Sequence, residues 1–226
     1  MRGHAGRGFT LLEALAGLAI GLIVVTAATA FALGHLRDDQ AAWARSRLLR
    51  ELRMASDVVA HDLRRAGHWA GAAPAAWRPA ASGAPPANPY AALAPDAAAS
   101  DAVQFSYASS AVPRPVADDE RLGFRLRGGV VEMMLGAGRW QALTDAGSVV
   151  VTEFTITPTV ERIPLRSLCP TACPASAPEC GPVQSVRSVA IVLGGRSVAH
   201  PPVERLLRSV VRLRNDVVAG ACPQAS

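Results

Sequence analysis

A long uncharged segment near the amino terminus constrains the fold of this chain more than any other feature. Residues 14–34 form a run of 21 residues without a charged side chain. An α-helix needs about 20 mainly apolar residues to cross a bilayer, and the apolar core of a secretory signal peptide has only about 7–15. We therefore expect a helix that spans a membrane once. The alternative is a secretory signal cleaved after residues 28–30 (Ala-Thr-Ala).

The acidic residue Glu13 lies at the start of this apolar segment. A carboxylate inside a membrane-spanning helix is costly, and it usually marks a functional site with a specific partner. Cleavage between Gly8 and Phe9 would create a positively charged amino terminus and make Glu13 the fifth residue of the shortened chain. We expect the amine of a neighbouring chain to pair with the Glu13 carboxylate. The alternative is that Glu13 is solvated among lipid headgroups.

Residues 8–22 (GFTLLEALAGLAIGL) resemble the prepilin cleavage and methylation motif of type IV pilins and type II secretion pseudopilins. The shared features are a short basic leader, Gly8, Phe9, Glu13 and an apolar span that follows at once. The resemblance implies that prepilin peptidase cleaves after Gly8 and N-methylates Phe9. It also implies that the Glu13 carboxylate recruits and aligns subunits.

Residues 51–71 (ELRMASDVVAHDLRRAGHWAG) resemble the end of the long helix in PilW-type minor pilins. One departure from the major pilins is that the first proline is Pro74, so the membrane half of the helix lacks their usual proline. The resemblance implies a structural subunit, without enzymatic activity or cofactor, that primes type IV pilus assembly. The alternatives are a type II secretion pseudopilin, a tip adhesin or DNA-binding subunit, and a secreted enzyme.

The same resemblance predicts the partners and the location of the chain. The partners are prepilin peptidase, other minor and major pilins, the inner-membrane assembly platform and the lipid bilayer. We expect one pass through the inner membrane, with a cytoplasmic amino terminus and a periplasmic carboxyl-terminal domain, and then a place in the pilus. Five arginines after the span (Arg37, Arg45, Arg47, Arg50 and Arg53) oppose this orientation by simple counting, but long domains cross membranes largely regardless of charge.

The net charge does not point to nucleic acid as a partner. All 23 basic residues are arginines, and the formal net charge is only +5 over 226 residues. A nucleic-acid-binding domain gathers its basic residues on one face, whereas these are spread along the whole chain. We expect no nucleic-acid binding from charge alone.

The pattern of apolar residues predicts an α+β fold in which a long amino-terminal helix packs on an antiparallel sheet. Apolar residues recur at helical spacing up to Ala66, and Gly67 suits the position after a helix end. Alternating patterns then predict strands at 102–108, 122–127, 130–135, 139–143, 149–157, 185–193 and 203–214. We expect a leader at 1–8, a transmembrane half-helix at 9–35, an amphipathic half-helix at 36–67, an Ala/Pro-rich loop at 68–101 and a β domain at 102–226.

The four cysteines, Cys169, Cys173, Cys180 and Cys222, are expected to form two disulfides in an oxidising compartment, with three pairings open. A zinc site is the alternative, but the spacing lacks the usual C-x2-C pair. Asp118, Asp119 and Glu120 offer oxygen ligands for calcium but lack the spacing of a calcium loop. We interpret these three acids as a solvated turn and expect no metal site.

Overall fold

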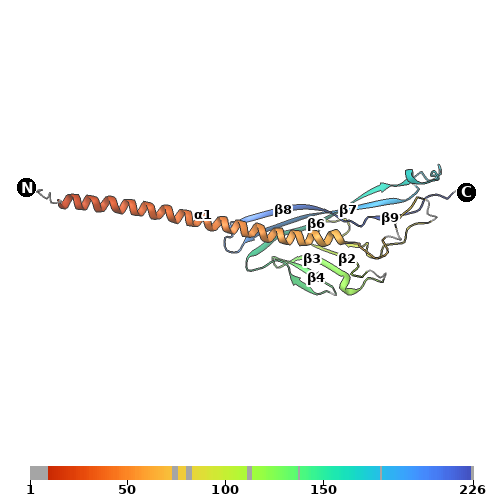
Figure 1. Ribbon diagram of the computed structural model, residues 1–226, viewed down its shortest axis with the longest axis horizontal. Helices are drawn as coiled ribbons and strands as arrows, with labels where there is room; N and C mark the ends of the chain where they lie inside the picture. Colours follow the sequence, from red (N-terminus) through yellow and green to blue (C-terminus); the bar gives the residue numbers. More distant parts are fainter. Residues whose placement is uncertain are drawn as a thin grey trace, which may run out of the picture. The chain divides into compact units, whose positions relative to one another are not determined.

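The computed structural model describes residues 10–72, 76–79, 83–110, 114–136, 138–178 and 180–224. The chain divides into two compact units, Met1–Ala44 and Arg45–Ser226. Helix α1 (Leu11–Arg65) begins in the first unit and ends in the second (Figure 1). Within the described residues, α1 is the single helix long and apolar enough to cross a membrane.

In the second unit, α1 buries one face. Leu48, Leu52, Val59 and Leu63 are at most 1% exposed, and their spacing of four or seven residues places them on the same side of the helix. Leu49, the next residue after Leu48, is only half-buried, so Leu48 takes the core position.

The helix ends as the sequence predicts. Gly67 adopts a left-handed conformation with a φ of 78°, which a residue after a helix end commonly needs and which glycine adopts without strain. Its N–H donates a hydrogen bond to the Ser106 carbonyl at 2.9 Å. The helix terminus is thereby joined to the first sheet.

The β-structure forms two antiparallel sheets rather than the one sheet expected. The first has five strands in the order β1-β2-β3-β4-β5, and the second pairs β6 with β7 and β7 with both β8 and β9. The fold class is confirmed, because a long amino-terminal helix is followed by antiparallel sheets. The strands are β1 (Leu93–Ala94), β2 (Ala102–Ser106), β3 (Arg121–Arg127), β4 (Val130–Leu135), β5 (Trp140–Ala142), β6 (Val149–Pro164), β7 (Val183–Ser197), β8 (Glu204–Arg212) and β9 (Val217–Ala219).

The strands expected at 122–127 and 130–135 form the antiparallel hairpin β3–β4, with Gly128 and Gly129 as its turn. Gly128 and Gly129 have φ angles of 58° and 78°, and a two-residue turn whose central residues both have positive φ matches the twist of the flanking strands. The Gly129 carbonyl accepts a hydrogen bond from the Val151 N–H at 2.8 Å. The hairpin thus fastens the first sheet to β6 of the second.

The two long strands of the second sheet extend beyond their predicted ends. We expected β6 to stop before Pro158, but it continues because it is an edge strand, where a proline removes no hydrogen bond from a second neighbour. We expected β7 to stop before Gly194 and Gly195, but it continues to Ser197. A Cβ at Gly195 would lie 3.2 Å from Leu52 Cδ2, so the glycine allows the strand to approach the helix closely.

Two short strands and a buried tyrosine are missing from the sequence prediction. The expected loop at 68–101 contains β1, and its Tyr90 is only 2% exposed. Strand β9 follows the last predicted strand and pairs with β7 at Val183–Ser185. Such short strands have too few residues to show an alternating pattern. Short 3₁₀ helices also occur at Asp118–Glu120 and Arg166–Leu168.

Candidate functional site

The first turn of α1 positions the carboxylate of Glu13. Thr10 precedes the helix, and its backbone N–H and its hydroxyl donate hydrogen bonds to Glu13 Oε2 at 3.1 and 2.9 Å. The Glu13 N–H donates in return to Thr10 Oγ1 at 3.3 Å. This reciprocal pattern is a capping box, which satisfies donors that a helix start leaves without partners. Glu13 therefore also caps the helix, a role that we did not predict from the sequence.

Glu13 is exposed and has no cationic partner among the residues that the structure describes. Gly8 and Phe9, the residues of the expected cleavage and methylation site, lie outside the described residues. The structure therefore shows an accessible carboxylate at the start of an apolar helix.

The surface that follows Glu13 is apolar and exposed. Phe31 is 70% exposed and Ile23 66%, which is unusual for a surface in contact with water. A lipid bilayer or a bundle of similar helices would cover such a surface. The other large exposed side chains of this segment are Leu11, Leu12, Leu15, Leu18, Ile20, Leu22, Val24, Val25 and Leu33.

All four cysteines form disulfides within the second unit. Cys169 pairs with Cys222, and Cys173 pairs with Cys180. The sequence left three pairings open, and the observed one places the short loop 173–180 inside the larger loop 169–222. Because the thiols are consumed, they are not zinc ligands.

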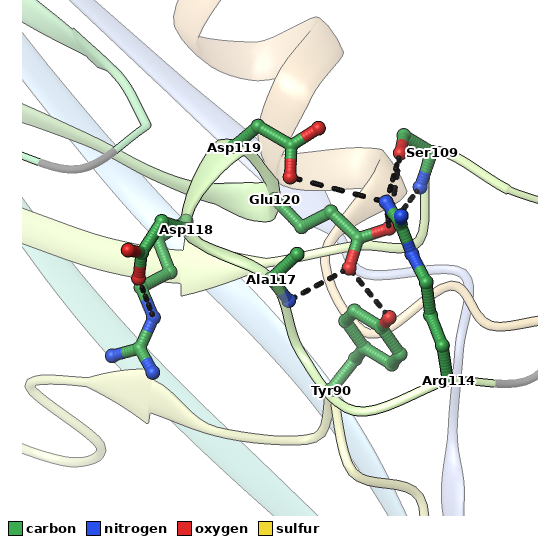
Figure 2. Close-up of polar contacts among 8 residues, drawn as sticks. Tyr90, Ser109, Arg114, Ala117, Asp118, Asp119 and Glu120 are labelled. Carbon is green, nitrogen blue, oxygen red and sulfur yellow. Dashed lines mark hydrogen bonds and ion pairs between the residues drawn. The ribbon is translucent and has the colours of Figure 1, made fainter.

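The buried carboxylate of Glu120 holds three segments of the second unit together (Figure 2). Its side chain has no exposed surface. Oε2 accepts hydrogen bonds from the Tyr90 hydroxyl at 2.7 Å and from the Ala117 N–H at 3.0 Å. Oε1 accepts from the Ser109 N–H and hydroxyl at 2.8 and 3.0 Å and from Arg114 Nη2 at 2.9 Å.

These hydrogen bonds determine the charge state of the network. The hydrogen bond from the Tyr90 hydroxyl has the largest effect on Glu120 and lowers its pKa below the usual range. The hydrogen bond from the Ala117 backbone N–H lowers the pKa further. Burial, and then the adjacent Glu120 carboxylate, raise the pKa of the Tyr90 hydroxyl. At neutral pH the network therefore contains an ionised carboxylate and a neutral phenol.

Our interpretation of Asp118, Asp119 and Glu120 as a solvated turn is wrong for Glu120. Asp118 lies 3.7 Å from Arg121, Asp119 lies 3.9 Å from Arg114, and Glu120 points into the interior. The three carboxylates therefore do not converge on a calcium position. Across the described part of the chain, no group of three or more His, Cys, Asp or Glu side chains could hold a metal ion.

We expect Glu120→Gln to lower the thermal unfolding midpoint of the full-length protein in detergent by roughly 5–10 °C at pH 7. A group whose pKa is lowered on folding stabilises the fold above its ordinary pKa, and this stability is lost as the pH falls towards the folded value. Wild type should therefore lose its advantage over the variant as the pH falls below about 4.3, the usual pKa of glutamate. Differential scanning calorimetry between pH 3 and 7 measures this difference.

The matched control for that experiment is Asp119→Asn, which removes a neighbouring charge whose side chain is 63% exposed. It should shift the midpoint by less than about 2 °C, because exposed ion pairs contribute little. Equal effects of the two variants at pH 7 would contradict a special role for Glu120.

Comparison with known families assigns the chain to a class. Residues 4–29 match the family model of the prokaryotic N-terminal methylation motif, and residues 42–213 match that of prepilin peptidase-dependent protein B. Together these matches indicate a type IV pilin-like minor pilin or pseudopilin. Because the second match covers more than half of the chain, the protein belongs to the prepilin peptidase-dependent protein B family.

No curated protein matches the chain, and no solved structure does. The families that match are pilin-like and structural rather than enzymatic. A single amino-terminal apolar helix together with a prepilin motif fits a membrane-anchored pilin.

Proposed function

We propose that this protein is a minor pilin that takes part in priming type IV pilus assembly. The observation that carries the proposal is the methylation motif at residues 4–29, with the Glu13 carboxylate exposed at the start of an exposed apolar helix. The resemblance of residues 51–71 to PilW-type minor pilins supports a priming role. The expected partners are other minor and major pilins and the inner-membrane assembly platform.

The first step of this function is processing by prepilin peptidase, a partner that the family match supports. The peptidase cleaves between Gly8 and Phe9 and methylates the new amino terminus of Phe9. In the assembled state, the amine of a neighbouring chain replaces Thr10 as the partner of the Glu13 carboxylate. A charge pair in an apolar helix bundle is poorly screened, so this pairing would align neighbouring subunits along their axes.

Before assembly, the protein is held in the inner membrane by residues 9–35, with its amino terminus in the cytoplasm and its carboxyl-terminal domain in the periplasm. Two disulfides in that domain support this orientation, because disulfides persist in the periplasm and are rare in the cytoplasm. After assembly, the apolar face of α1 would exchange lipid contacts for contacts with other helices.

A type II secretion pseudopilin shares the leader, the apolar helix and Glu13, so it is the second candidate. Deletion of the gene in its own host separates the two. We expect surface pili to fall at least about tenfold, as measured in sheared filament fractions, while type II secretion of exoproteins is unchanged, and we expect the intact gene to restore the pili. Normal piliation with lost secretion would instead identify a pseudopilin.

A further inference from the structure

The outer edge of β8 is open. Strand β8 pairs with β7 along Glu204–Arg212, and no strand pairs with its other edge among the residues that the structure describes. An open edge presents unpaired backbone N–H and C=O groups that can bind another extended chain.

From Leu206 to Arg212, side chains on the outer face of β8 alternate between apolar and basic, after the acidic Glu204 at the start of the strand. Leu206 is 46% exposed and Val210 is 73% exposed, and the exposed Arg208 and Arg212 are on the same face of the strand. The opposite face points inward, since Val211 is 1% exposed and Ser209 Oγ lies 3.5 Å from Ser56 Oγ of α1. We refer to Leu206, Arg208, Val210 and Arg212, with the open backbone beside them, as the β8 edge.

The arginines of the β8 edge lack acidic neighbours within the sheet. Arg208 lies opposite Val192 of β7, and Arg212 lies opposite Ser188. Arg212 forms an ion pair with Asp216 at 2.8 Å, but Arg208 has no ion pair among the described residues. The positive charge of Arg208 is therefore left without an acidic partner.

Further arginines line a hollow at one end of the β8 edge. Its volume is about 440 Å³, and it is lined by Arg64 of α1, Val210, Arg212 and Arg214. The backbone N–H of Arg214 donates to the Arg64 carbonyl at 3.3 Å, which joins the strand end to the helix. No ion pair involves Arg64 or Arg214 within the described ranges.

We propose that the β8 edge binds an extended acidic segment of another pilin-like subunit, which adds to the second sheet as a further strand. Directly opposite side chains on neighbouring strands interact, and opposite charges stabilise the pair. The added strand should therefore place acidic residues beside Arg208 and Arg212, with an apolar residue between them beside Val210. This predicts the pattern acidic-x-apolar-x-acidic, and the identity of the partner as a subunit rests on the proposed function.

A polypeptide fits this surface better than a nucleic acid does. Open backbone donors and acceptors are satisfied by another strand, and exposed Leu206 and Val210 find apolar partners there. A phosphate backbone would pair with the arginines but would leave both the strand edge and these apolar side chains uncovered.

The test uses the mature full-length protein in detergent micelles and a fluorescent peptide, Thr-Glu-Thr-Val-Thr-Glu-Thr-Val-Thr. We expect saturable binding by fluorescence anisotropy, weakened at least about tenfold by the double substitution Arg64→Glu and Arg208→Glu. The matched control, Arg127→Glu with Arg162→Glu, makes the same charge change at exposed positions of β3 and β6 and should leave binding unchanged. The same peptide N-methylated at alternate residues should not bind, because it has lost the backbone donors.

Three outcomes would overturn the proposal: no binding of the peptide to wild type, equal binding of the N-methylated peptide, or equal weakening by the control pair. A DNA duplex that binds where the peptide does not, with an affinity that falls steeply with salt, would identify a nucleic-acid surface instead. The proposed function is tested separately, by measuring the mass of the mature chain and its presence in sheared pili. A chain that is not processed, or that is absent from pili, contradicts the proposed function. A processed and incorporated protein that does not bind the peptide overturns only the docking site.

Discussion

Replacing Glu13 with alanine is expected to remove the chain from filaments while leaving cleavage after Gly8 and membrane insertion intact. The substitution deletes the one acidic group in the first turns of the apolar segment, so insertion becomes easier while the partner amine loses its counter-charge. Removing one partner of a desolvated charge pair is strongly destabilising to an interface. We expect the amount of the protein in sheared pili to fall at least about tenfold, measured by immunoblot against the membrane fraction.

Two further variants separate the charge of Glu13 from its capping role. Glu13→Gln keeps an oxygen that can accept hydrogen bonds from Thr10 but removes the charge, so it should be as defective as the alanine variant. Thr10→Val removes the hydroxyl that lies 2.9 Å from Glu13 Oε2 and keeps the charge, so it should still enter pili. If the Glu13→Ala variant were found in sheared pili in the same amount as wild type, the proposed pairing would be refuted.

Gly8→Val is expected to leave the leader, residues 1–8, attached to the chain. The family resemblance implies that prepilin peptidase requires a glycine before the cut, and valine adds a branched side chain there. Without cleavage, no free amine forms at Phe9 and no charge pair with Glu13 is available, so assembly should also stop. Intact-mass spectrometry of the membrane fraction distinguishes the full chain from a chain that begins at N-methylated Phe9.

The same leader offers matched controls for this prediction. Gly3→Val and Gly6→Val make the identical chemical change away from the cut, and we expect both variants to be processed normally. Cleavage of Gly8→Val at the wild-type position would contradict the proposal. A mature chain beginning at Phe31 would instead show that signal peptidase had cleaved after Ala30.

Features governed by neighbours along the chain could be predicted from the sequence. The helix end at Gly67 and the turn at Gly128-Gly129 depend on local backbone conformation, and both have the positive φ angles that such positions use. The apolar run of α1 likewise depends on composition within one segment. Prediction also found the candidate carboxylate Glu13, because an acid among apolar residues is conspicuous without any knowledge of the fold.

Features governed by contacts between distant residues could not be predicted. Glu120 gathers donors from Tyr90 and Ser109, which lie 30 and 11 residues away, and in the sequence it is indistinguishable from the exposed acids beside it. In the sequence, Gly195 indicates a strand end. In the fold, it lies against Leu52 of the helix, where a side chain would be too close. The only local signal at Glu120 was its position two residues before a predicted strand, which does not indicate burial.

The two disulfides determine how the domain responds to proteolytic cutting. Cys173–Cys180 closes a loop that lies inside the one closed by Cys169–Cys222, with sequence separations of 7 and 53 residues. A single peptide-bond break between residues 173 and 180 is thus bridged by both crosslinks, and a break elsewhere between 169 and 222 is bridged by the outer one. A molecule nicked between residues 169 and 222 therefore stays in one covalent piece.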